Sequence, residues 1–131
     1  MQRKVGVLLA LIGLLSAGQV LTAHHSFSVE YSQEKPVKLT GVVTKVEWTN
    51  PHARFYIDVV GDKGATTNWN IELAAVSALR RNGWTSRSLN VGDTVTVEGF
   101  GSIQDFPRAS AGSVVLGSGR SLFAGANDQQ Y

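Results

Sequence analysis

The sequence predicts an all-β protein with one short helix, folded as a single five-stranded Greek-key barrel of the oligonucleotide/oligosaccharide-binding (OB) type. Two observations favour this class. Short segments alternate apolar and polar residues, as half-buried strands do, and they follow the order of three strands, a helix and two strands. A small open β-sandwich with one covering helix is the alternative. Because such barrels carry many unrelated functions, the fold alone predicts no activity.

The first three strands are predicted from residues 37–48, 53–60 and 68–73. In the first of them the apolar positions change parity, so we expect a bulge or bend near Gly41 that lets one strand serve both sides of the barrel. A turn at residues 61–64 joins the second strand to the third. One face of these two strands carries the expected core residues, which are Phe55, Ile57, Val59, Trp69, Ile71 and Leu73.

The helix is predicted over residues 74–82, because Val76 and Leu79 share one side of it and Gly83 supplies a C-terminal stop. Two more strands are expected after the helix, and a loop that contains Pro107 separates them. The aromatic side chains are expected mainly in the core. The two strands cover 94–100 and 113–116, the loop between them covers 101–112, and a candidate short edge strand covers 121–124. The aromatic residues expected mainly in the core are Trp48, Tyr56, Trp69, Trp84 and Phe100.

The N-terminus has the features of a secretory signal peptide. Arg3 and Lys4 give a positive start, and the apolar run that follows is too short for a comfortable transmembrane helix. We expect cleavage after Ala23, with residues 16–18 as a competing small-residue site. The chain then divides into a signal peptide at 1–23, a barrel domain at 24–126 and a flexible tail at 127–131. The mature protein is expected in the periplasm or outside the cell.

Composition limits the classes of partner. The full chain has 12 Lys and Arg residues against 10 Asp and Glu residues, and two of the basic residues leave with the leader. A charge-balanced mature chain lacks the positive surface of a nucleic-acid-binding protein. The chain has no cysteine, which excludes disulfides and thiolate metal sites. No membrane span is expected after the signal is removed.

The three histidines carry most of the functional information. Cleavage after Ala23 gives a mature chain that begins at His24-His25 with a free α-amine. An amine and a neutral imidazole can chelate one ion together, and imidazole suits copper and zinc. His24 can bind through its own amine and ring, or His25 through the amine, the intervening amide and its ring. The alternative is that both are polar residues at a flexible start.

His52 lies in the segment Trp48-Thr49-Asn50-Pro51-His52-Ala53, at a predicted junction of strand and loop. The phase of the following strand places it with Arg54 and away from the core. It is therefore a candidate third copper ligand beside His24 and His25, with Asn50 or Glu72 as the group that orients its ring. The alternative is a histidine that is hydrogen-bonded within the loop and caps a strand end.

Six segments of the chain carry a resemblance, and they are HHSF at 24–27, GVV at 41–43, VEWTNPHA at 46–53, WNIEL at 69–73, GW at 83–84 and GDTVTVEG at 92–99. Together they resemble one uncharacterised family of small secreted bacterial proteins, known as a domain of unknown function. The resemblance covers nearly all of residues 23–124 and implies secretion and a barrel-like fold, but no activity. The chain differs from the pattern of this family at two places. At position 54 it has arginine where a bulky apolar residue is expected, and at 74–76 it has Ala-Ala-Val where a proline or asparagine is expected nearby.

Three classes of function follow. The first is a periplasmic protein that binds copper(II) through His24, His25 and His52, for storage, delivery or sensing. The second, close behind, is a binding module that recognises an envelope protein or a small ligand without a metal. The third is a copper-dependent oxidoreductase. A protein without catalytic activity is favoured, because Glu47, Glu72 and Glu98 lie on separate predicted strands and show no convergent pair.

Overall fold

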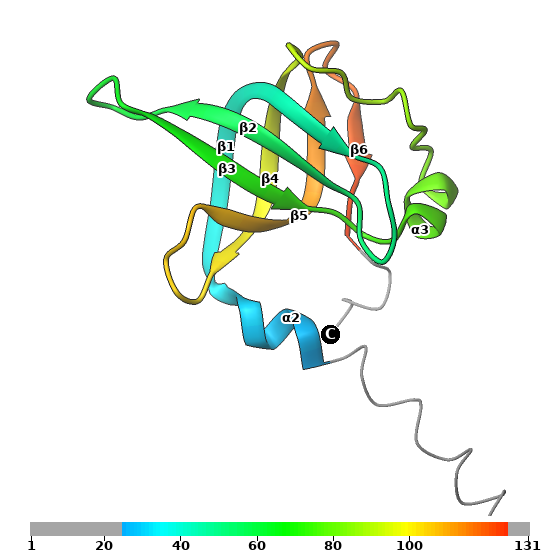
Figure 1. Cartoon of the computed structure of the whole chain (residues 1–131), viewed down its shortest axis with the longest axis horizontal. Helices are drawn as coiled ribbons and strands as arrows, with labels where there is room; N and C mark the ends of the chain where they lie inside the picture. The colour runs from blue at the N-terminus through cyan, green and yellow to red at the C-terminus, as the bar shows by residue number, and fades with distance from the viewer. Residues whose placement is uncertain (1–24, 126–131) are drawn as a thin grey trace, which may run out of the picture.

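The computed structural model describes residues 25–125 (Figure 1). The predicted signal peptide at 1–23, His24 and the predicted tail at 127–131 lie outside the described residues. The described part is β-rich and contains two short helices, whereas the sequence predicted one. The elements in chain order are α2 (His25–Glu30), β1 (Tyr31–Glu47), β2 (Arg54–Val60), β3 (Thr66–Glu72), α3 (Val76–Arg81), β4 (Thr94–Ser102), β5 (Arg108–Leu116) and β6 (Ser121–Phe123).

The six strands form one sheet in the order β3-β2-β1-β4-β5-β6, and neighbours in this order are antiparallel. One further pairing joins β3 to β5 in parallel, where residues 70–72 of β3 lie opposite residues 108–110 of β5. The first strand of the order therefore also contacts the fifth, and the long β1 curves between its two partners (Figure 1).

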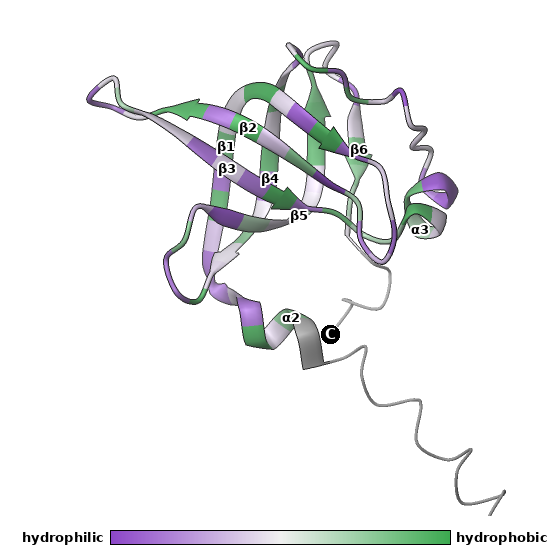
Figure 2. Cartoon of the chain, in the orientation of Figure 1, coloured by the Kyte–Doolittle hydropathy of each residue, from purple (hydrophilic) through white to green (hydrophobic). Residues whose placement is uncertain are grey.

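The core lies on one side of the sheet and follows the predicted alternation. Phe55, Ile57 and Ile71 are fully buried, as is Leu79 of α3. Figure 2 shows hydrophobic and hydrophilic residues interspersed along the strands, as expected for strands with one buried face. Trp84 is buried beside α3 and donates its indole N–H to the carbonyl oxygen of Phe123, at 2.8 Å. We call the side of the sheet away from this core the outer face.

The irregularity predicted near Gly41 is present, but it lies a few residues further along β1. The register between β1 and β2 shifts between Val43 and Lys45, so the irregularity lies at Thr44. Gly41 is required for a different reason. A Cβ atom at this position would lie 2.5 Å from the carbonyl oxygen of Asp58 on the neighbouring strand. Glycine permits this close approach of two backbones.

The predicted loop at 101–112 is also wrong over most of its length. β4 continues to Ser102 and β5 begins at Arg108, which leaves only a five-residue turn. Small residues fill the start of β5 and give little strand signal in the sequence. They fit because β4 and β5 approach closely here: a Cβ atom on Gly99 would lie 2.0 Å from the carbonyl oxygen of Ser110.

The sequence did not predict α2. This helix has six residues, which is too short to be stable by itself. The ring of Phe27 packs at a centroid distance of 6.1 Å from Phe100 and 5.7 Å from Tyr31. Phe100 therefore lies on the outer face beneath α2 rather than in the core. Among the helices of residues 25–125, none is long and apolar enough to cross a membrane.

Candidate functional site around Glu72 and His52

The strand registers bring residues of five strands into one row on the outer face. Residues that stand directly opposite on paired strands share a face of the sheet. Phe100 of β4 faces Ser110 of β5, which faces Glu72 of β3. Glu72 in turn faces Arg54 of β2, and Arg54 faces Glu47 of β1. Four residues of this row can hydrogen-bond, and α2 lies over the end that begins at Phe100.

Glu72 is the centre of the row. Its Oε2 accepts a hydrogen bond from the Tyr31 hydroxyl at 2.8 Å and lies 2.6 Å from the Arg54 guanidinium nitrogen NH2. Its Oε1 lies 3.4 Å from Nδ1 of His52. The side chain is only 15% exposed. A carboxylate so far removed from water needs partners for its charge, and Arg54 and Tyr31 supply them.

The ring of His52 has a defined orientation. Its Nδ1 lies 2.9 Å from the carbonyl oxygen of Leu73. Because a carbonyl oxygen only accepts, Nδ1 carries the proton, and in the neutral ring the lone pair lies on Nε2. The side chain is 41% exposed, which confirms the predicted position outside the core. A histidine held through Nδ1 by a carbonyl, with a carboxylate close by, has the arrangement of many metal-binding histidines.

Tyr31 links the start of β1 to Glu72. The residue is 3% exposed although it lies on the outer face, opposite Ser102 of β4. Burial raises the pKa of its hydroxyl above the ordinary value, and the negative charge of Glu72 raises it further. The hydroxyl therefore stays protonated over the physiological range and acts as a fixed donor to Glu72.

α2 is attached to the outer face at both ends. Phe27 supplies the aromatic contacts with Phe100 and Tyr31. At the other end, the carbonyl oxygen of Glu30 accepts a hydrogen bond from the amide of Ile103 at 3.0 Å, and its carboxylate lies 3.5 Å from Arg108. These contacts fix the position of α2 on the outer face.

The structure describes only part of the predicted metal site. His24 lies outside the described residues, and His25 is the first residue of α2, with a side chain that is not described. Within residues 25–125, no group of three or more His, Cys, Asp or Glu side chains is arranged to hold a metal ion. The structure does place Tyr31, the residue that directly follows α2, and His52 against the same carboxylate of Glu72.

The sequence indicated Glu72 as a candidate for the group that orients His52, but it missed the roles of Tyr31 and Arg54. A signal for Arg54 was present: a hairpin with its turn centred on Lys63 pairs Arg54 with Glu72, as the structure has it. No comparable signal existed for Tyr31, because its contact with Glu72 joins residues 41 positions apart through tertiary structure alone.

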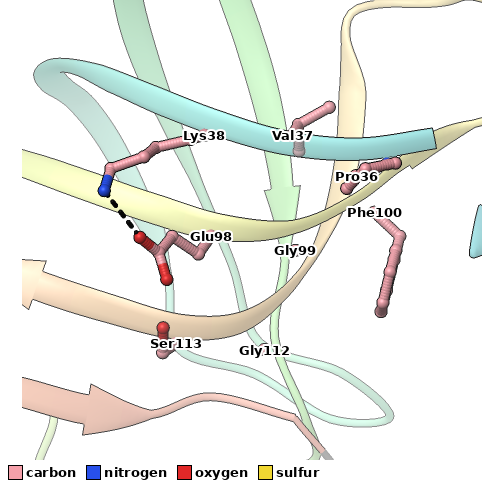
Figure 3. Close-up of a pocket in the computed structure, with 8 residues that line it drawn as sticks. All are labelled: Pro36, Val37, Lys38, Glu98, Gly99, Phe100, Gly112 and Ser113. Carbon is pink, nitrogen blue, oxygen red and sulfur yellow. Dashed lines mark ion pairs between the residues drawn. The ribbon is translucent and has the colours of Figure 1, made fainter.

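A second feature of the outer face is an open hollow over β1, β4 and β5 (Figure 3). Phe100 forms part of its apolar wall, and Lys38 and Glu98 form an ion pair of 2.8 Å on its charged side. The hollow shares Phe100 with the row through Glu72 but does not include His52. Its lining residues are Pro36, Val37, Lys38, Glu98, Gly99, Phe100, Gly112 and Ser113.

The sequence of the chain matches the model of a protein family. The sequence model described as "Family of unknown function (DUF6152)" matches residues 11–105, which include α2, β1 to β4, His52 and Glu72. No curated protein matches the chain. The match therefore identifies the relatives of the chain without giving an activity, and the function has to be inferred from the geometry.

Proposed function

The chain belongs to the family of unknown function DUF6152, and we propose that it is a small exported OB-type barrel that binds one copper(II) ion through His24, His25 and His52. The role is storage, delivery or sensing of the metal in the periplasm or outside the cell. The observation that carries the proposal is the orientation of His52, whose Nδ1 is held by the Leu73 carbonyl so that Nε2 remains for a ligand.

The strand pairings support the barrel. The parallel contact between β3 and β5 brings together the two ends of the order β3-β2-β1-β4-β5, which is the pairing that closure of a five-stranded barrel requires. α3 follows β3 and precedes β4, which is the order expected of an OB barrel. β6 adds to the outside of β5 as an edge strand.

The surroundings of His52 support a metal site. Imidazole is a good ligand for copper(II), and the α-amine at His24 adds a second nitrogen donor once the leader is removed. His52 is partly exposed, so an ion can reach it. Glu72 lies next to the held nitrogen, 3.4 Å from Nδ1, where it helps to orient the ring. Both ligand segments are connected to this carboxylate, His52 directly and α2 through Tyr31.

The test is a copper(II) titration of exported protein whose intact mass shows a start at His24. We expect one ion per chain, with affinity that falls steeply below about pH 6, because amine and imidazole must lose protons to bind. His52→Ala and an added residue before His24 should each weaken binding. Thr49→Ala, in the same exposed loop, is the matched control and should bind as the parent does. Parent-like affinity in both altered proteins would reject the proposal.

A binding module without a metal is the second candidate, and the hollow of Figure 3 favours it. An aromatic wall beside an exposed ion pair suits a ligand or protein segment with apolar and charged groups. This reading predicts that a partner captured from the envelope is lost when Phe100→Ala is introduced and is retained in His52→Ala. The opposite pattern would favour the metal.

A further inference from the structure

We infer that α2 is a displaceable cover, and that the surface beneath it binds a peptide segment that carries an aromatic side chain and a carboxylate three residues apart. The surface consists of Tyr31, Phe100 and Arg108, and we call it the receiving surface. The segment belongs to another protein and takes the place of α2. Binding of this kind does not depend on copper(II), because none of the three residues is a proposed metal ligand.

Two side chains of α2 show which groups the receiving surface accepts. The ring of Phe27 lies edge-to-face against Phe100, at a centroid distance of 6.1 Å, and 5.7 Å from the ring of Tyr31. Three residues further along, the carboxylate of Glu30 lies 3.5 Å from the guanidinium nitrogen NH2 of Arg108. The surface therefore offers an aromatic contact and a cation at a spacing that one short segment of chain can match.

The third contact of α2 is made by its backbone. The carbonyl oxygen of Glu30 accepts a hydrogen bond from the amide of Ile103 at 3.0 Å. A main-chain carbonyl is present in every peptide and absent from a free aromatic acid. Ring, carboxylate and carbonyl together favour a peptide segment as the ligand, because main-chain bonds supply affinity and side-chain contacts supply specificity in peptide recognition.

α2 is held weakly enough to be displaced. Its six residues are too few for a helix that is stable alone. The ion pair between Glu30 and Arg108 joins side chains that are 46% and 35% exposed, so it contributes little. Nε of Arg108 is buried and has no hydrogen-bond partner within residues 25–125. A ligand carboxylate that accepts from Nε as well as NH2 forms the stronger bidentate pair and can therefore compete with Glu30.

The receiving surface remains in place when α2 leaves, because all three of its residues belong to the sheet. Tyr31 is 3% exposed, donates to Glu72 and stands opposite Ser102 of β4. Phe100 and Arg108 lie within β4 and β5. Phe100 also lines the hollow of Figure 3, so a peptide longer than α2 can continue from the receiving surface into that hollow.

The test uses a capped synthetic peptide with the sequence of residues 26–30, SFSVE, and the full chain in a form that lacks the grip of α2. The double variant Phe27→Ala/Glu30→Gln removes the two side-chain contacts of α2 and leaves the receiving surface unchanged. We expect the peptide to bind this variant and to shift the amide resonances of residues 100–103 and 108–110. The parent should bind about 10-fold to 1000-fold more weakly, because an open state of about 0.1–10% lowers the apparent affinity by that fraction. Val29→Ala is the matched control, since Val29 is 70% exposed on the same helix, and it should bind as the parent does.

Changes in the peptide test the two side-chain contacts without altering the fold. A peptide with alanine in place of its phenylalanine, or glutamine in place of its glutamate, should bind the double variant more weakly. If Arg108→Met is added to the double variant, the glutamate and glutamine peptides should bind equally. Where the double variant does not fold, Phe27→Ala alone replaces it. Equal affinity of the peptide for the parent and the folded opened variant would overturn the covering role of α2, and no binding to the opened variant would overturn the receiving surface.

Discussion

Arg54 and Glu72 stand directly opposite each other on β2 and β3, and the guanidinium nitrogen NH2 of Arg54 lies 2.6 Å from Oε2 of Glu72. The two side chains are 26% and 15% exposed, so most of the pair is removed from water. Arg54 is therefore the main partner for the charge of a carboxylate that also holds Tyr31 and lies beside His52.

Replacement of Arg54 by Met should lower the free energy of unfolding by about 3 kcal/mol, because it leaves Glu72 largely buried without its cation. Urea unfolding at neutral pH measures this. Lys38→Met is the matched control, since Lys38 pairs with Glu98 at 2.8 Å on an exposed surface, and its loss should be below about 1 kcal/mol. Equal losses would show that Glu72 is not dependent on Arg54.

The Tyr31 hydroxyl should lose its proton later than an ordinary tyrosine. Its raised pKa stabilises the folded state below the ordinary value of 10.0, and this stabilisation is lost as the pH rises from there toward the folded pKa. Ultraviolet titration of the phenolates should therefore show one of the three tyrosines of the chain titrating with unfolding. In Tyr31→Phe this late step should disappear; its persistence would assign it to another tyrosine.

Ile57 is fully buried at the centre of the core. Its truncation to Ala should cost about 2–5 kcal/mol, the usual range for a buried aliphatic side chain. Val60→Ala on the same strand is the control, because Val60 is 67% exposed, and its effect should stay within about 0.5 kcal/mol. A similar small effect at Ile57 would contradict the strand phase.

Gly99 lies where the backbones of β4 and β5 approach each other closely. Gly99→Ala should destabilise the protein by more than about 1 kcal/mol, because the added Cβ would lie 2.0 Å from the carbonyl oxygen of Ser110 and force the strands apart. Gly112→Ala adds the same methyl group at an ordinary contact of 3.6 Å and should be nearly neutral. Thermal unfolding of the two variants under the same conditions measures the difference. Equal stability losses would contradict the close approach at Gly99.

The sequence predicted β2, β3 and β4 closely, because alternation along a strand is a local property. Phe55, Ile57 and Ile71 were placed in the core for that reason, and they are buried there. The beginning of β5 was missed because Ala109 and Ala111 are small residues, which bury well only where a neighbouring backbone comes close. The close approach of two strands depends on how they pack together. It therefore produces no alternation of apolar and polar residues in the sequence of either strand.

The same distinction applies to the site. The position of His52 outside the core followed from the strand phase, and the structure confirms it. The link from Tyr31 to Glu72 did not, because it depends on how the chain folds over between two distant segments. α2 was missed for a related reason. Its six residues are too few to form a stable helix alone, and the helix is stabilised by contact with Phe100, which is distant in the sequence.

The two partners of β1 have a consequence for how the chain folds. β1 pairs with β2 across a short connection, but it also pairs with β4, where Leu39 faces Val97. The sheet therefore cannot be completed before β4 is available to pair with β1, and pairings of such long sequence separation slow folding. Until then one edge of β1 stays open to other chains. We expect refolding yield to fall with protein concentration, and the β2–β3 hairpin to gain protection before β4 does.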